Sequence, residues 1–138
     1  MKKGIIWIIS LVFVLTLSAC QEQLDITQGI IDVQYENVRY EGSSIVVDVY
    51  ITNGTDASYD VNYVELWFEF PESTVDEFGI TDIEFCGAGF DIYETVKSQG
   101  YKQYEIEFTS EYIFYSQTEL ESYQLTLDDL ELYFWIEE

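Results

Sequence analysis

The chain has 138 residues, of which 48% are hydrophobic and 17% aromatic, so it is long and apolar enough for one domain with a buried core. Its 27 Asp and Glu residues outnumber five Lys and Arg residues and give a net charge of -22, which excludes the basic patch of a nucleic-acid-binding protein. Because the sequence contains no His, imidazole-dependent catalytic sites and His-rich zinc sites are also excluded.

The amino-terminal residues have the order of a secretory signal peptide. Lys2 and Lys3 give a positive start, and residues 4–16 form an apolar run that is too short to span a bilayer. The small residues Ser18 and Ala19 follow this run. We therefore expect residues 1–19 to be a signal peptide that is removed from the mature protein.

The stretch Leu17-Ser18-Ala19-Cys20 resembles the lipobox of bacterial lipoproteins. This resemblance implies that the chain is cut before Cys20 and that Cys20 is lipidated. Two acyl chains hold a protein stably at a bilayer, so the resemblance predicts an anchor at the extracytoplasmic face of a bacterial cell membrane. The alternative is an ordinary secretory signal with an incidental Cys at its cleavage site.

Cleavage after residue 19 strengthens the acidic character of the chain. The basic side chains that remain are Arg39, Lys97 and Lys102. Most carboxylates then lack a cationic partner within the chain, and a surface of this kind repels anionic lipids. We expect residues 20–29 to form a lipidated Cys and a polar tether, which holds a domain of residues 30–138 off the membrane.

Alternation of apolar and polar residues predicts four strands, each with one face on a core. The apolar face of the first strand carries Ile45, Val47, Val49 and Ile51. That of the second carries Val64, Leu66, Phe68 and Phe70. The third carries Tyr104, Ile106 and Phe108, and the fourth carries Leu130, Leu132, Phe134 and Ile136. Weaker strand patterns cover residues 30–40, 80–86 and 90–96, whereas residues 118–125 fit either a short helix or an irregular connection.

Turn-forming residues separate these elements. They lie at residues 41–43, 53–55, 71–73, 87–89 and 98–100. About seven strands punctuated in this way predict an all-β fold, and specifically an antiparallel immunoglobulin-like β-sandwich.

Four segments resemble small immunoglobulin-like domains of bacterial surface proteins. They are Ile45–Thr55, with its Asn-Gly-Thr step after a strand, Val64–Phe68, Ala88–Phe90 and Tyr104–Phe108. The resemblance is to SLAP-type and to telokin-like or FxLYD-type lipoprotein domains, and it covers residues 30–138. It implies an extracytoplasmic binding or envelope-associated role without a catalytic centre, and it carries over no functional residues.

Several aromatic residues fall on strand faces where polar residues are expected. They are Tyr50, Trp67, Tyr133 and Trp135, and the carboxylates expected near them include Glu65, Glu69 and Glu131. Either loops or the tether cover these rings, or the rings are singly exposed, as surface aromatics often are. The functional interpretation is an interaction surface with an aromatic centre and an acidic rim, suited to a basic protein segment or a carbohydrate.

Outward-pointing carboxylates raise the question of bound cations. Those expected on non-core faces are Glu65, Glu69, Glu105, Glu107, Glu131 and Glu137. Clustered carboxylates on neighbouring strands favour a bound cation or a raised carboxyl pKa, and calcium is the natural candidate. The nearest dense groups, Asp76-Glu77 and Asp128-Asp129-Glu131, do not form a calcium-binding loop, so a solvated acidic surface is the simpler interpretation.

Catalysis finds little support in the residues. No pair of carboxylates stands out for glycoside hydrolysis, and Cys86, which has no His to activate it, is expected to be a buried apolar side chain. The sequence therefore predicts a membrane-anchored, non-catalytic binding module. A calcium- or cation-binding surface protein is the alternative, and a small glycoside-acting hydrolase is a weaker one.

Overall fold

A computed structural model describes residues 24–138 of the chain. The signal peptide and Cys20 lie outside the described residues, so the predictions for them remain predictions. The strands are β1 (Ile31–Glu41), β2 (Ser44–Asn53), β3 (Tyr59–Glu69), β4 (Glu84–Val96), β5 (Gly100–Phe108) and β6 (Glu131–Glu137). The helices are α2 (Glu72–Phe78) and α3 (Gln117–Ser122), with 3-10 turns η1 (Ser110–Tyr112) and η2 (Leu127–Asp129).

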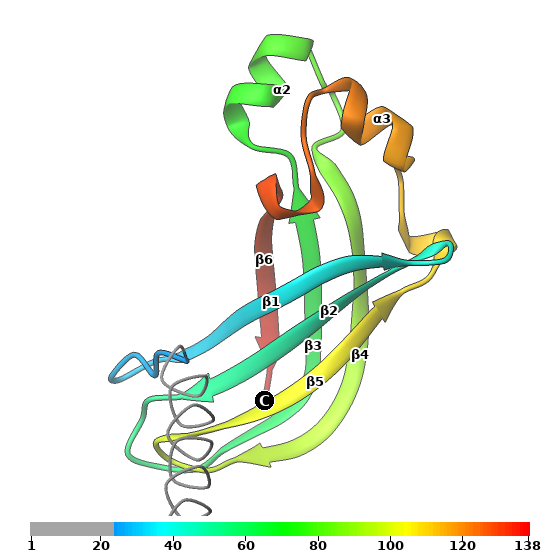
Figure 1. Cartoon of the computed structure of the whole chain (residues 1–138). Helices are drawn as coiled ribbons and strands as arrows, with labels where there is room; N and C mark the ends of the chain where they lie inside the picture. The colour runs from blue at the N-terminus through cyan, green and yellow to red at the C-terminus, as the bar shows by residue number, and fades with distance from the viewer. Residues whose placement is uncertain (1–23) are drawn as a thin grey trace, which may run out of the picture.

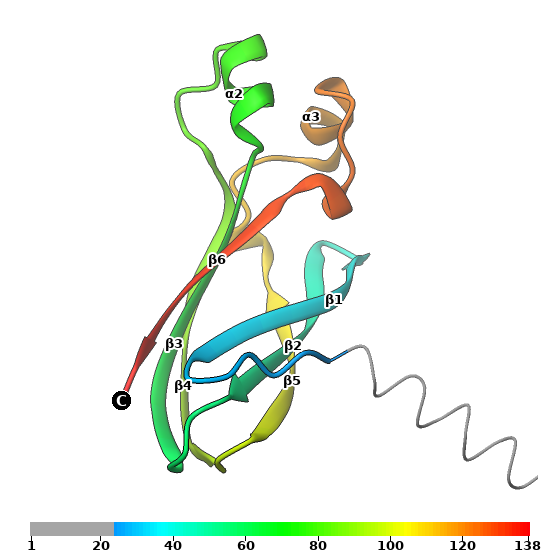
Figure 2. The same cartoon turned by 90° about the vertical axis from the view of Figure 1, so that its left-hand side faces the viewer.

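The described strands form two antiparallel three-stranded sheets that pack face to face as a β-sandwich. The strand order is β1-β2-β5 in one sheet and β4-β3-β6 in the other. The strands of the two sheets cross at an angle, and α2 and α3 lie together at one end (Figure 1). Seen from the side, the sheets form two layers, and β6 runs down one layer to the carboxyl terminus (Figure 2).

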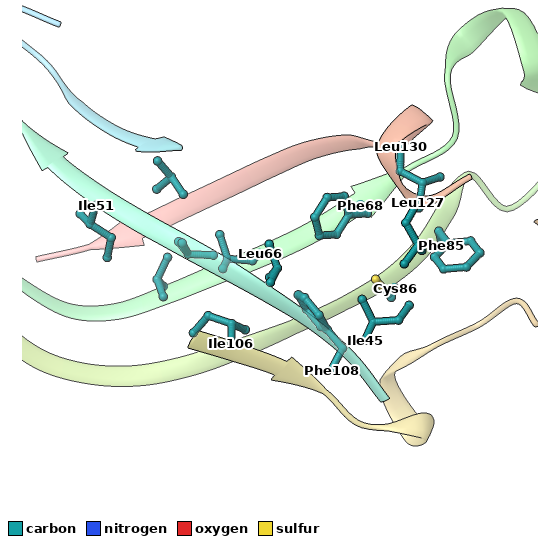
Figure 3. Packing of buried hydrophobic residues seen from close by; sticks show 14 of the residues in the cluster. Ile45, Ile51, Leu66, Phe68, Phe85, Cys86, Ile106, Phe108, Leu127 and Leu130 are labelled. Carbon is teal, nitrogen blue, oxygen red and sulfur yellow. The ribbon is translucent and has the colours of Figure 1, made fainter. Parts of the chain in front are cut away.

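Apolar side chains from both sheets meet between the layers (Figure 3). Phe68 of β3 lies at the centre of this core and is fully buried. Its ring packs edge-on against Tyr35 of β1 at 5.3 Å and against Phe108 of β5 at 6.1 Å. One side chain therefore links strands of both sheets, and such aromatic contacts stabilise beyond the area that they bury.

A second aromatic cluster joins the helical end to this core. Phe70, just after β3, is buried and packs edge-on against Phe85, Tyr115 and Tyr123 at 5.7, 4.8 and 5.6 Å. Phe78 of α2 lies 5.0 Å from Tyr123. These contacts hold the two short helices over the end of the sandwich.

The strongly alternating segments form strands as predicted. The predicted inner residues of β2 and β3 are almost fully buried, and Ile106 and Phe108 of β5 are buried too. Strand β6 also forms, but its inner face is only partly covered, because Phe134 remains 36% exposed. The predicted weak strand at residues 30–40 corresponds to β1.

The prediction of a turn at residues 87–89 is wrong. These residues lie inside the long strand β4, which joins residues 84–86 of one predicted strand to the predicted strand at residues 90–96; residues 80–83 lie before β4 and are not part of a strand. The described part of the chain therefore has six strands rather than about seven. The glycines there accommodate side chains of β3 rather than a reversal of the chain, as described below.

The prediction of a simple turn at residues 71–73 is also wrong, because α2 begins there. Pro71 directly precedes the helix, and Gly79 ends it with a left-handed backbone, φ 65°. This is the usual asymmetry of Pro at a helix start and Gly at its end. For residues 118–125, the helical alternative is confirmed by α3, which begins with a capping box between Ser116 and Glu119.

The segment before β1 is fixed to the loop that follows β2. The amide of Gly29 donates to the carbonyl of Gly54 at 2.8 Å, and the amide of Gly54 donates to the carbonyl of Ile30 at 2.9 Å. The side chain of Gln28 donates to that of Gln99 at 2.9 Å. The chain therefore enters the sandwich at the end opposite α2 and α3 (Figure 1).

We predict that Phe68→Ala lowers the free energy of unfolding by about 3–5 kcal/mol, because it removes a fully buried ring between the sheets and leaves a cavity. Denaturant unfolding measures the change. Phe114→Ala is the control, since that ring is 52% exposed and its loss should cost less than about 1 kcal/mol. Similar losses for the two variants would contradict the packing described here.

Candidate functional site

The outer face of the β4-β3-β6 sheet brings together most of the predicted site residues. Because the inner residues of β3 enter the core, the intervening residues must point outward. In the antiparallel register, Trp67 pairs with Tyr133 and Glu65 pairs with Trp135 of β6. We call Tyr63, Trp67, Tyr133 and Trp135 on this side of the sheet the aromatic face.

The rings of the aromatic face pack against one another across the strands. Trp67 and Tyr133 are stacked, with ring centroids 6.1 Å apart and planes 18° from parallel. Tyr63 meets Trp135 nearly edge-on at 6.2 Å. Trp135 is 53% exposed and Tyr133 is 41% exposed, whereas Tyr63 and Trp67 are half-buried. The outer sheet surface therefore presents a contiguous group of rings to solvent in the described part of the chain.

Two glycines of β4 make room for this face. Gly87 pairs with Trp67, and a Cβ atom at Gly87 would lie only 2.7 Å from the Cβ of Trp67. A Cβ atom at Gly89 would collide with the hydroxyl end of Tyr63. The Tyr63 hydroxyl and the Cβ of Trp67 therefore take up the space that side chains at Gly89 and Gly87 would need, which explains why a strand interior here contains residues that usually weaken strands.

Carboxylates border the aromatic face. Glu69 of β3 is in register with Glu131 of β6 on one side and with Glu84 of β4 on the other. The indole nitrogen of Trp67 donates to Glu69 Oε1 at 2.9 Å, and the Tyr133 hydroxyl donates to Glu131 Oε2 at 3.1 Å. The rings thus hold neighbouring carboxylates through hydrogen bonds without neutralising them.

The electrostatics of this border show crowding of like charges. Partial burial raises the pKa of Glu84, and the charges of Asp82, Glu65 and Glu69 raise it further. The hydrogen bond to Glu131 raises the pKa of Tyr133, with smaller contributions from nearby carboxylates. The contributions of neighbouring carboxylates to both shifts indicate a local negative potential that favours neutral or cationic groups.

None of the ion pairs within residues 24–138 involves a carboxylate of this border. Arg39 lies on the other sheet, where its guanidinium contacts Glu41, Asp48 and Glu105 at 3.0, 3.6 and 3.1 Å. Lys102 of β5 contacts Glu94 at 3.4 Å. Lys97 lies in the turn between β4 and β5. The described cations therefore do not offset the charge beside the aromatic face.

The structure does not bring Tyr50 to the aromatic face. Tyr50 points outward from β2, on the opposite side of the sandwich, where its hydroxyl donates to Glu36 at 2.5 Å and its ring lies 6.0 Å from Tyr101. The hydrogen bond to Glu36 is the main reason why the pKa of Tyr50 is raised to about 12. Glu105 and Glu107 belong to that side as well, because both lie on β5. Tyr50 and Trp67 therefore cannot share one interaction surface.

Two members of the site were missed by the sequence analysis, Tyr63 and Glu84. Tyr63 stands four residues before Trp67, which is the spacing of one strand face, but the predicted strand began at Val64. Glu84 reaches the border because a register shift lies between Phe68 and Glu69. Alternation along β3 could have identified Tyr63, whereas no local signal marks Glu84.

The acidic groups considered for calcium have other surroundings. Within residues 24–138, no group of three or more Asp, Glu, Cys or His side chains is placed to hold a metal ion. The carboxylate of Asp129 accepts a hydrogen bond from the amide of Thr126 at 2.7 Å and so caps η2. Asp76 and Glu77 lie on α2. The described part of the chain therefore offers no observation in favour of the calcium alternative.

A surface hollow elsewhere in the sandwich is lined by two carboxylates together with a cation. The hollow has a volume of about 440 Å³ and is lined by residues that include Arg39, Asp48 and Asp128. One of these carboxylates, Asp48, is contacted by the guanidinium of Arg39 at 3.6 Å. The expected burial of Cys86 is confirmed, and this burial raises the pKa of its thiol to about 12.

Comparison with known proteins yields no match to a protein family model, to a curated protein or to a solved structure. Among the described residues, no helix has the length and apolar character needed to cross a bilayer.

We predict that Glu84→Gln raises the free energy of unfolding at pH 7 by about 0.5 kcal/mol, the scale of a like-charge contact across strands. The folded state raises the pKa of Glu84, so it binds the Glu84 proton more tightly than the unfolded state does. The destabilisation is therefore present above the folded pKa and is relieved as the pH falls below the unfolded pKa.

Urea unfolding of both proteins between pH 7 and pH 4 checks this prediction, and the difference should shrink toward the acidic end. Glu107→Gln, an exposed change on β5, is the control and should leave stability nearly unchanged. A Glu84→Gln protein that is less stable at pH 7 would contradict the repulsion described here.

Proposed function

We propose that this chain is a non-catalytic binding module, anchored by lipid at Cys20 to the extracytoplasmic face of a bacterial membrane, and that its aromatic face binds a cationic protein segment. The observation that carries the proposal is the exposed ring group bordered by Glu65, Glu69, Glu84 and Glu131 without a cation of its own. The function consists of holding a partner rather than transforming a substrate.

A Lys or Arg side chain suits this face for two reasons that act together. Its cationic head is attracted to the faces of Trp and Tyr rings, and it also reduces the repulsion among the bordering carboxylates. Its aliphatic stem packs against apolar ring surface. A neutral carbohydrate could stack on the same rings, but it would leave the carboxylates uncompensated. The charge pattern therefore favours a basic protein or peptide.

The membrane anchor is part of this proposal and rests on the lipobox resemblance at residues 17–20. The attachment of Gly29 to Gly54 supports it, because the chain then enters the domain at one end and leaves the aromatic face open. Anchoring also fits the excess of acid, since a domain that repels anionic lipids needs a covalent link to stay at the membrane.

We also propose that the sandwich is immunoglobulin-like and related to the SLAP-type or telokin-like and FxLYD-type lipoprotein domains. Two antiparallel sheets packed face to face support this assignment. The six described strands make the domain slightly smaller than the seven-strand form of that fold. This assignment concerns ancestry and is separate from the binding proposal.

We predict that the full chain in a neutral detergent binds an oligo-arginine peptide at low salt, and that affinity falls about tenfold or more between 20 and 150 mM NaCl because screening weakens the ionic contacts. Isothermal titration calorimetry measures both affinities. Trp135→Ala should weaken binding about tenfold through loss of a ring contact.

Tyr101→Ala is the matched control, because that ring is 44% exposed but lies on β5 in the other sheet. It should bind like the parent chain. Equal losses from Trp135→Ala and Tyr101→Ala would remove the aromatic face as the binding site. If the chain binds neutral oligosaccharides with an affinity that salt does not change, and does not bind the peptide, the partner is a carbohydrate and not a cationic segment.

We predict that cells fed a clickable palmitate analogue label the parent chain and do not label Cys20→Ser, since the acyl chains require the Cys20 residue. Cell fractionation should place the parent in membranes and shift the variant away from them. Cys86→Ala serves as the control and should be labelled like the parent, because the buried Cys86 thiol is not the acylation site. Labelling that persists in Cys20→Ser would disprove the anchor.

A further inference from the structure

Strand β6 forms an open edge of the β4-β3-β6 sheet. In the described residues it pairs with β3 only, in an uninterrupted register from Tyr63 opposite Glu137 to Glu69 opposite Glu131. Backbone groups on its other side have no strand partner within residues 24–138. Of the two edge strands of the other sheet, β1 shifts its register between Glu36 and Arg39, whereas β5 pairs with β2 without a shift. A regular, unpaired edge is a template for one more strand.

The inner side of β6 also lacks a complete cover. Phe134 points toward the core side of the sheet, yet it is 36% exposed, whereas Leu66, its partner across the register on β3, is fully buried. Ile136 on the same side is only half-buried. The apolar layer between the sheets therefore ends at β6 with side-chain surface still in contact with water.

The outer side of β6 carries carboxylates and aromatic rings, in contrast to the apolar residues of its inner side. Glu131, Tyr133, Trp135 and Glu137 alternate with the inner residues and belong to the aromatic face or its acidic surroundings. A strand laid beside β6 would thus meet carboxylates and rings with one set of its side chains, and exposed apolar surface with the other set.

We propose that the cationic partner binds as an extended segment that adds a strand to β6, with Lys or Arg residues alternating with apolar residues. This inference rests on the proposed function and specifies its partner. The basic side chains would lie over the aromatic face near Glu131 and Glu137, and the apolar side chains would cover Phe134. Backbone hydrogen bonds along the edge supply affinity, and the alternation supplies specificity.

A second copy of this chain is a poorer occupant of the edge. Antiparallel pairing of two β6 strands about Phe134 would set Glu131 of each copy opposite Glu137 of the other on the outer side. Like charges opposite each other destabilise a strand pair, and two chains of net charge -22 repel at longer range. Charge therefore selects a basic segment over self-association.

The test uses the full chain in a neutral detergent and a nine-residue peptide of alternating Lys and Val. A peptide of the same composition, with Lys and Val in two separate blocks, is the control ligand. Hydrogen exchange read by mass spectrometry should show the amides of residues 131–137 slowed about tenfold or more by the alternating peptide, while those of β1 keep their rates. The block peptide should bind more weakly and leave the rates of residues 131–137 unchanged.

Charge variants locate the contact. Glu131→Gln with Glu137→Gln should weaken binding of the alternating peptide about tenfold at low salt, because two ionic contacts are lost. Glu77→Gln with Glu107→Gln removes the same charge from exposed positions on α2 and β5, and should have little effect.

The outcomes separate this inference from the proposed function. If both peptides bind equally and the amides of residues 131–137 stay unprotected, strand addition is overturned while a cation-binding face stands. If neither these peptides nor oligo-arginine binds at low salt, the proposed function fails as well. Protection of β6 without any peptide, together with a dimer that strengthens with added salt, would overturn the inference in favour of a second copy.

Discussion

The packing of alternate β3 side chains in the core determines both how the two sheets are joined and which residues face the solvent. Phe68 contacts Tyr35 and Phe108 and so fastens the central strand of one sheet to both outer strands of the other. Strand geometry then leaves no choice about the remaining side chains, because residues alternate between the two faces. Tyr63 and Trp67 must therefore stand on the solvent side, where the Tyr63 hydroxyl and the Trp67 Cβ leave no room for a Cβ atom at Gly89 and Gly87 of β4.

The proposed binding would be coupled to stability on this face. Glu84, Glu69 and Glu131 lie in one row across the sheet, and repulsion within such rows lowers the stability of the unoccupied fold. A cationic ligand that reduces this repulsion stabilises the folded state by more than its direct contacts alone. On the proposed function, the sheet surface would give up some stability of the free domain in exchange for affinity toward positive charge, a common relation at functional sites.

Alternation of apolar and polar residues sufficed to predict β2, β3 and β5. In a strand with one covered face, the polarity of each residue indicates whether its side chain faces the core or the solvent. It also placed Trp67 and Tyr133 on outward faces. Their stacking was not predictable, since it depends on pairing between strands that are far apart in sequence. Tyr50 shows the same limit. Its outward orientation on the strand was predicted correctly, but alternation could not say which of the two sheets its strand would join. Gly87 and Gly89 led to the wrong prediction of a turn, because glycine is common in turns. Here glycine is required because side chains of the neighbouring strand β3 leave no room for a Cβ atom.

The hydrogen bonds that join Gly29 and Ile30 to Gly54 also bear on how the domain would be oriented if it is anchored as proposed. If the chain is anchored through Cys20 as proposed, α2 and α3 lie at the end farthest from the bilayer; β3, β4 and β6 extend toward that end, and β1, β2 and β5 cross them obliquely (Figure 1). The aromatic face on β3 and β6 would then point parallel to the bilayer plane and not away from it. In that orientation, the aromatic face would be most accessible to other proteins that diffuse in the plane of the same membrane.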